Sequence, residues 1–140
     1  MTGTVKLKVR YSETDRMGIV YHANYYPWFE LGRLAILEEI GLSYASFEEM
    51  GLFMPLTETH CKHIRPCTFD DEITVKARLV KLTPVRCAFE YEVFKVEELI
   101  AVGKTVHAFT DNTPKVTSLK VNYPDLWNTL PGILEEEQHA

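Results

Sequence analysis

Hydrophobic and polar residues alternate at the start of the chain, and the alternation has a period of two. This period predicts a half-buried strand with a cationic outer face, followed by a polar loop over residues 12–18. The apolar positions of the strand are Val5, Leu7, Val9 and Tyr11, and the basic positions are Lys6, Lys8 and Arg10.

From residue 24 to residue 40 the pattern changes to one that is apolar at most positions, which predicts the longest helix of the chain. Asn24 is a suitable N-cap, and Pro27 falls in the first turn, where its missing N–H costs nothing. Gly41 supplies the stop. A helix that is apolar around nearly its whole circumference is a buried one, so we expect other parts of the chain to wrap around it.

Shorter elements follow the long helix. A short helix should end at Gly51, and it begins either at Ser46, with Glu49 at capping-box spacing, or at Ser43. Asp111 opens a break after the last strand, and a weak amphipathic helix is expected over residues 124–134. Strands are predicted over residues 53–65, 72–82, 86–96 and 99–110, the last two forming a hairpin.

The order of these elements is one strand, a helix and then four strands. Consecutive strands with short connections form an antiparallel sheet. One buried helix and one sheet give an α+β architecture in which the sheet curls around the helix. At 140 residues the chain fits one domain over residues 1–140.

Composition narrows the class of protein. Hydrophobic residues make up 46% of the chain, enough for a real core, yet no apolar run is long enough to span a bilayer. The N-terminal residues lack the apolar core of a signal peptide, so we expect a soluble cytoplasmic protein that does not bind membranes. The formal net charge of −5 argues against general nucleic-acid binding, which needs a basic face, but a local basic patch would still suit a phosphorylated ligand.

Asp15 is the most interesting carboxylate, because it stands in a short loop just before the long helix. An Asp in a loop most often caps a turn. Here Gly18 gives the loop unusual backbone freedom, and the helix start offers unpaired N–H groups that can polarise a carbonyl. An acid opposite such donors resembles a hydrolytic site, although the pattern is not unique to one. Glu13 is a rival acid, ranked lower because it lies further from the helix and could face solvent.

The histidines and cysteines fit other chemistries less well. A triad of Ser12, Asp15 and His22 lacks the sharp G-x-S-x-G nucleophile turn, so His22 is expected to contribute its backbone N–H and its ring. His60 and His63 would point to opposite faces of a strand, and no further ligands stand at usable spacing for a metal. The chain has three cysteines, an odd number, and their spacing matches no disulfide pattern. We therefore expect free thiols.

A basic cluster precedes Pro66. Its members are Lys62, His63 and Arg65. Such a cluster is either a solvated strand end or a phosphate-binding site, for which the bidentate contacts of Arg are well suited. The chain contains no glycine-rich phosphate loop of either common kind.

The run YSETDRMGIVYHANYYPWFE, residues 11–30, resembles the signature of the hotdog-fold acyl-CoA thioesterases, in the branch of 4-hydroxybenzoyl-CoA thioesterase and YbgC/FadM. The shared features are a Thr-Asp pair, a Gly three residues on, the string V-Y-H-A-N-Y and an aromatic-Glu pair. The run HIRPCTFDDEITV, residues 63–75, is similar to a family strand in which Arg-Pro precedes an acidic pair. The resemblance extends over residues 5–110.

The resemblance implies a hotdog fold, in which an antiparallel sheet wraps around one long central helix. It also implies homodimers or homotetramers with active sites at subunit interfaces. Asp15 matches the family's catalytic Asp, and the N–H that polarises the carbonyl would come from Tyr21 or His22. Asn24 and Tyr25 match positions that line the pocket.

His63 falls where family members often carry an aromatic residue, so a neutral imidazole ring would take that part. The CoA phosphates would lie on surface cations such as Lys62, Arg65 or Lys115. Asp15 would act either as the general base that activates water or as the nucleophile that forms a mixed anhydride.

The leading hypothesis is therefore an acyl-CoA thioesterase that needs no metal or redox cofactor and releases a free acid and CoA. Two alternatives remain: a thioesterase acting on acyl carrier protein, and a non-catalytic module that binds acyl-CoA. The net charge of −5 makes an acidic carrier protein the less attractive partner. The acyl group is left open between short, long and aromatic.

Overall fold

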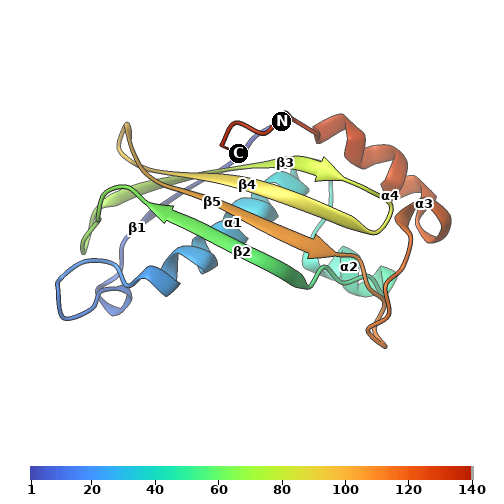
Figure 1. Cartoon of the computed structure of the whole chain (residues 1–140), viewed down its shortest axis with the longest axis horizontal. Coiled ribbons are helices and arrows are strands. Elements are labelled where there is room, and N and C mark those ends of the chain that lie inside the picture. Colours follow the sequence, from blue (N-terminus) through green and yellow to red (C-terminus); the bar gives the residue numbers. More distant parts are fainter. Residues whose placement is uncertain (140) are drawn as a thin grey trace.

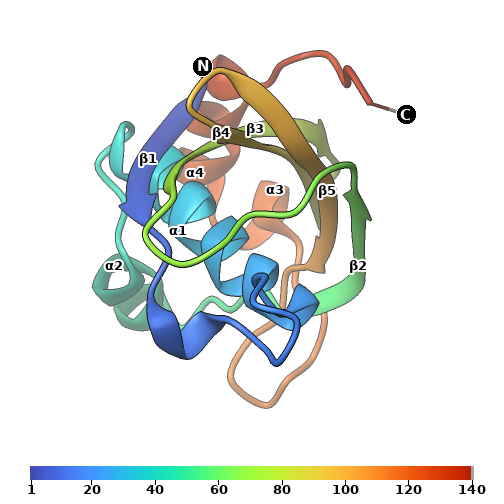
Figure 2. The same ribbon diagram turned by 90° about the vertical axis from the view of Figure 1, so that its left-hand side faces the viewer.

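The computed structural model describes residues 1–139, and its main feature is a curved five-stranded antiparallel sheet around a central helix (Figures 1 and 2). The strands lie in the order β1-β3-β4-β5-β2. Their bounds are Gly3–Lys8 for β1, Leu56–His63 for β2, Glu72–Leu82 for β3, Arg86–Lys95 for β4 and Glu98–Ala108 for β5. Both β1 and β2 are therefore edge strands.

The central helix is α1, Tyr25–Glu38. Figure 2 shows it lying inside the curve of the sheet, between β1 on one side and β2 on the other. The further α-helices are α2 (Tyr44–Met50), α3 (Leu119–Asn122) and α4 (Pro124–Thr129). Short 3-10 turns cover η1 (Tyr11–Glu13), η2 (His22–Asn24) and η3 (Leu130–Ile133).

The core between α1 and the sheet is built on an aromatic stack. The rings of Phe29 and Tyr91 lie 4.5 Å apart at an interplanar angle of 10°. Gly103 faces this stack from β5, and a Cβ there would overlap the Phe29 ring. The close approach of helix and sheet thus depends on a residue without a side chain.

The prediction that α1 is wrapped all round is only partly correct. Its sheet-facing residues Phe29 and Ile36 are fully buried. Leu31, by contrast, is 43% exposed, and Leu34 is half-buried. The sheet covers one side of the helix, so the apolar residues on the other side stay open within a single chain.

The predicted strand over residues 53–65 is too long at both ends. Phe53 makes only an isolated bridge with Thr110, and Pro55, which has no N–H to donate, separates that bridge from β2. At the far end, the N–H groups of both Ile64 and Arg65 donate to the carbonyl of Ile100, which ends the regular ladder.

At the helix starts, one of the two alternatives for α2 is confirmed, whereas the expected cap of α1 is not formed. Ser43, not Ser46, caps α2: its Oγ accepts from the backbone N–H of Ser46 at 3.2 Å. Gly51 ends α2 with a φ of +67°. Asn24 stands at the N-cap position of α1, but its side chain makes no cap and instead donates to the carbonyl of Glu13 at 2.8 Å.

Candidate active site

Asp15 lies in a tight hairpin turn between Thr14 and Val20, which form an isolated antiparallel bridge. Its backbone N–H donates to the carbonyl of Ile19 at 3.0 Å, and Gly18, with a φ of +78°, closes the turn. The carboxylate oxygen Oδ1 accepts from the N–H of Met17 at 2.8 Å. Oδ2 accepts no hydrogen bond from residues 1–139, so the turn fixes the carboxylate and leaves one oxygen available.

A hollow of about 320 Å³ opens beside this carboxylate, and it unites residues from three parts of the chain. The loop before α1 supplies Asp15 and His22, the first turn of α1 supplies Tyr25, and the end of β2 with the residues after it supplies His63 and Arg65. An isolated bridge between Ile19 and Thr68 holds the loop against the segment after β2. Of the predicted site residues, these five are brought together.

The two predicted backbone donors are not equivalent. The N–H of Tyr21 is already used, because it donates to the carbonyl of Glu13 at 2.9 Å. The N–H of His22 finds no acceptor within the described part of the chain. His22 begins a 3-10 turn that runs directly into α1, so its N–H carries the partial positive charge of a helix start. The geometry favours His22 over Tyr21 as a donor to a ligand.

Glu13 does not face solvent, contrary to the expectation, since it is only 7% exposed. Its two oxygens accept from the backbone N–H of Arg10 at 2.8 Å and from the indole N–H of Trp28 at 2.9 Å. These bonds satisfy a buried carboxylate and tie the loop to α1. Glu13 therefore supports the loop and does not line the hollow.

Tyr25 and His63 form the inner wall of the hollow. Their rings meet edge-on at 4.6 Å, and the Tyr25 hydroxyl lies 3.4 Å from Cys67 Sγ. Burial and the bond to Cys67 raise the pKa of Tyr25 well above its usual value. Partial burial and the neighbouring His22 lower the pKa of His63, so its ring is neutral near pH 7.

The predicted basic cluster is divided by the alternation of β2. Lys62 points away from His63 and lies with His60 and Lys104 on the opposite face of the sheet. Arg65 stays at the hollow, where its Nε is 3.5 Å from an oxygen of Glu98. Asn24 and Tyr21 do not line the hollow. The apolar wall made by Ile19 and Ile64 was not foreseen, because it needs a contact between segments far apart in sequence.

A cysteine nucleophile and a metal site would each need particular side chains close together. Cys61 Sγ lies 3.9 Å from His63 Nδ1. Burial raises the pKa of Cys61 to about 11, so the thiol stays protonated and is a poor nucleophile. Among residues 1–139, no group of three or more His, Cys, Asp or Glu side chains is placed to hold a metal ion. Across the same residues, no helix is both long and apolar enough to cross a membrane.

Comparison with known proteins decides the family. Residues 9–125 match the family model described as the Thioesterase-like superfamily. The chain belongs to this family of thioester-hydrolysing enzymes. The α+β prediction of an antiparallel sheet around one long helix, and the resemblance to hotdog thioesterases, are thereby confirmed.

Three relatives illustrate the range of the family. A DHNA-CoA thioesterase from Staphylococcus aureus is 31% identical with a TM-score of 0.87, over 94% of this chain and 89% of its own. YneP of Bacillus subtilis, named as a candidate acyl-CoA thioesterase, is 29% identical over 89% of this chain and 91% of its own. The acyl-acyl carrier protein thioesterase ATL3 of Arabidopsis thaliana is 32% identical over 77% of this chain and 58% of its own.

Proposed function

We propose that this protein is an acyl-CoA thioesterase that hydrolyses a CoA thioester to a free acid and CoA. The observation that carries the proposal is the shared hollow in which Asp15, with one free carboxylate oxygen, and His22, with a free backbone N–H at the helix start, lie together. The family membership and the names of the S. aureus and B. subtilis relatives support a CoA thioester as substrate.

In the general-base route, Oδ2 of Asp15 removes a proton from a water molecule, and the water oxygen attacks the thioester carbonyl carbon. The backbone N–H of His22 donates to the oxyanion that forms. The C–S bond then breaks, and the CoA sulfur leaves as the thiol after taking the proton back from Asp15. Aligned donors at a helix start need no rearrangement during the reaction, which is the source of their catalytic effect.

In the nucleophilic route, Oδ2 of Asp15 attacks the carbonyl carbon itself. The CoA thiolate leaves, a mixed anhydride remains on Asp15, and water then hydrolyses the anhydride to free acid and carboxylate. Both routes use the same oxygen and the same N–H of His22. Single-turnover hydrolysis in ¹⁸O water tests for the anhydride, because water that opens it at the Asp15 carbonyl carbon leaves label in the Asp15 carboxylate, which the general-base route never does.

Arg65 is the cation best placed to bind a CoA phosphate, because it stands at the rim of the hollow that contains Asp15. Its side chain is largely exposed, and its guanidinium lies 3.5 Å from an oxygen of Glu98. Lys62 lies on the other face of the sheet, away from this hollow.

We also propose that the whole chain, residues 1–140, forms one hotdog domain that assembles as a homodimer, with a homotetramer as its further association. β2 is an edge strand whose backbone has a partner on only one side, and all its residues except Cys61 are exposed. An uncovered edge of this length is normally paired or protected. The exposed apolar side chains of Leu31, Leu56 and Ile64 lie on α1 or flank this edge.

A carrier-protein substrate is the second candidate function, and the similarity to ATL3 favours it. The formal charge of −5 counts against an acidic carrier. Comparison of kcat/KM for the same acyl group on CoA and on acyl carrier protein decides between the two carriers. A non-catalytic binding module would bind the thioester without releasing thiol.

Asp15→Asn tests the proposal, because the amide keeps the shape but removes the base or nucleophile. We expect kcat to fall by at least about 10²-fold, as is typical for loss of a general base. The measurement is release of free thiol from a panel of short, long and aromatic acyl-CoA substrates. Asp125→Asn, on an exposed residue of α4, is the matched control. Near-normal turnover by a folded Asp15→Asn protein would reject this site.

A further inference from the structure

The imidazole ring of His63 is a polar group of the Asp15 hollow to which the mechanism above gives no task. It stands at the end of β2, and its ring meets edge-on, at 4.6 Å, the ring of Tyr25, the first residue of α1. His22, whose backbone N–H is free, begins the 3-10 turn that runs into the same helix. Both histidines line the hollow that contains Asp15. The imidazole therefore lies beside the helix start that carries the proposed oxyanion donor.

Two hydrogen bonds fix this ring relative to the loop that carries the catalytic acid. The N–H of Val20 donates to the Cys67 carbonyl at 2.9 Å, and the Thr68 hydroxyl donates to the Gly18 carbonyl at 2.5 Å. Both bonds join the loop before α1 to the segment that follows β2. The end of β2, and with it His63, is thus held in place against the loop.

Cys61 determines which ring nitrogen of His63 carries the proton. Residues 61 and 63 share one face of β2, and Cys61 Sγ lies 3.9 Å from Nδ1 of the ring. Because the thiol stays protonated, its S–H can donate, and the ring nitrogen is the better acceptor of the two atoms. A neutral imidazole that accepts at Nδ1 carries its own proton on Nε2. No group within residues 1–139 is hydrogen-bonded to Nε2, so this N–H is an unused donor.

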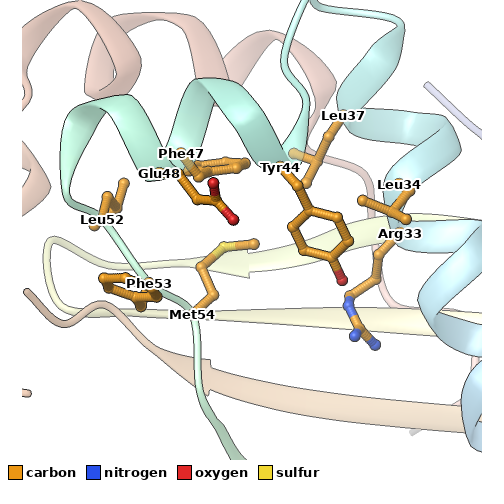
Figure 3. Close-up of a pocket in the computed structure, with 9 residues that line it drawn as sticks. All are labelled: Arg33, Leu34, Leu37, Tyr44, Phe47, Glu48, Leu52, Phe53 and Met54. Atoms are coloured by element: carbon orange, nitrogen blue, oxygen red, sulfur yellow. The ribbon is translucent and has the colours of Figure 1, made fainter. Parts of the chain in front are cut away.

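His107 is a useful contrast, because both of its ring nitrogens are engaged within the chain. It is bonded to Met54, which lines the cavity between α1, α2 and the segment leading into β2 (Figure 3). Its Nδ1 donates to the Met54 carbonyl at 3.0 Å, since a carbonyl can only accept. Its Nε2 must then accept from the Thr105 hydroxyl at 2.8 Å. Such a ring holds the fold together, whereas the ring of His63 keeps one nitrogen for a ligand.

The surroundings of His63 suit a neutral donor. The start of α1 carries a partial positive charge, which disfavours an imidazolium beside it and favours negative charge on a bound oxygen. A neutral imidazole at a helix start can polarise a carbonyl through its N–H. It also holds its remaining proton far more tightly than an oxyanion would, so the proton stays on Nε2 while charge develops on the oxygen.

We infer that the Nε2–H of His63 is a second donor to the thioester oxygen, beside the backbone N–H of His22. The inference rests on the proposed thioesterase function. When water or Asp15 attacks the carbonyl carbon, the π electron pair moves onto the oxygen and both N–H groups hold it there. The pair returns as the C–S bond breaks, and no proton leaves His63. His63 is then a catalytic residue, and Cys61 is a positioning residue that selects the tautomer.

Two substitutions of His63 separate the donor from the ring. His63→Phe keeps a planar ring without a donor, and His63→Gln keeps an amide N–H near the position of Nε2. On the CoA thioester that the wild type hydrolyses fastest, we expect kcat to fall by about 10²–10³-fold in His63→Phe, the usual cost of one lost oxyanion donor. In His63→Gln kcat should stay within about tenfold of the wild type, and KM should change little in both.

His60→Phe is the matched control, because His60 is exposed and lies with Lys62 and Lys104 on the opposite face of the sheet. It should leave kcat unchanged. Wild-type kcat in a folded His63→Phe protein would overturn the inference, and so would equal losses in His63→Phe and His63→Gln. Absence of thiol release by the wild type on every CoA thioester would instead reject the proposed function.

Nitrogen-15 NMR of the histidine rings reads the tautomer without any need for activity. In protein labelled with ¹⁵N-histidine near neutral pH, we expect the Nε2–H tautomer for His63, assigned by the signals that His63→Gln removes. Cys61→Ala should give a mixture of both tautomers and lower kcat by roughly two- to tenfold, in line with one lost weak hydrogen bond. Cys87→Ala, at a buried thiol of β4, is the control. A wild-type ring protonated on Nδ1 would overturn the inference, and an unchanged tautomer in Cys61→Ala would overturn the role of Cys61.

Discussion

At the scale of single residues, the hollow depends on the unequal surroundings of two nearby acids. Asp15 and Glu13 stand two positions apart in the same loop, yet Glu13 is saturated by Arg10 and Trp28 while Asp15 keeps one free oxygen. The difference comes from η1 and the hairpin turn, which direct Glu13 inward and Asp15 toward the hollow. Replacement of Glu13 would therefore act through the position of the loop.

His107 makes stability depend on pH. Burial lowers its pKa to about 4, and its Nε2 must stay unprotonated to accept from Thr105. The unfolded chain, with a His pKa of about 6.5, takes up the proton first as the pH falls. The stabilisation of the folded state by neutral His107 is therefore present above about pH 6.5 and is lost progressively as the pH falls below it. Between pH 7 and pH 5 the free energy of unfolding should fall by about 2 kcal/mol from this residue.

Urea unfolding at pH 7, 6 and 5 measures this effect. His107→Asn serves as the comparison, because its side chain does not titrate in that range. The loss of stability on acidification should be about 2 kcal/mol smaller in His107→Asn than in the wild type. Equal pH dependence in the two proteins would contradict a neutral, buried His107.

At the scale of elements, the packing of α1 on β5 depends on Gly103. A methyl group there would overlap Phe29, which is itself stacked on Tyr91 and cannot move freely. Gly103→Ala should lower the free energy of unfolding by about 1–3 kcal/mol through overpacking. Gly132→Ala is the matched control, because nothing lies within 4 Å of a Cβ at that position.

Thermal or denaturant unfolding of the two glycine variants gives the comparison directly. The control should remain within about 0.5 kcal/mol of the wild type, as is usual for surface changes. If Gly103→Ala were as stable as Gly132→Ala, the helix would have to lie further from β5 than the structure places it.

The same elements explain what could be predicted from the sequence. Most of β3 follows from a clean alternation over residues 72–79, and the span of α1 is close to the prediction because Pro27 falls in its first turn and Gly41 follows its end. The predicted N-terminal end of β2 was wrong because the ladder is interrupted at Pro55, so Phe53 forms only an isolated bridge. The hydrophobic pattern of a segment indicates that it can form a strand. Where the strand ends depends on the hydrogen-bonding partners that the rest of the chain supplies.

The candidate site follows the same rule. Asp15, His22 and Tyr25 are close in sequence, so the motif alone placed them together. His63 and Arg65 reach the hollow only through the bridge between Ile19 and Thr68, a long-range contact that no local pattern encodes. The hydrogen bond that occupies the N–H of Tyr21 and the burial of Glu13 also depend on tertiary contacts, so the sequence pattern did not reveal them.

At the scale of the whole molecule, the C-terminal segment fastens the outer face of the sheet. The N–H of Glu135 donates to the Leu79 carbonyl at 2.8 Å, and the N–H of His139 donates to Glu90 at 2.9 Å. Glu90 is fully buried and forms an ion pair with Arg78 at 2.6 Å. Lys104 binds Glu137 at 2.6 Å beside them. The segment therefore shields the Arg78–Glu90 ion pair from solvent on the face of the sheet opposite α1.

Removal of residues 135–140 should expose this pair and delete the backbone donors of Glu90, lowering the free energy of unfolding by about 1–3 kcal/mol. Full-length Glu136→Ala is the control, because Glu136 is exposed. Denaturant unfolding measures stability, and thiol release measures activity. Because the Asp15 hollow lies on the other side of the sheet, kcat/KM should be unchanged well below the melting temperature. A truncated protein of wild-type stability would mean that solvent satisfies Glu90 as well as the segment does.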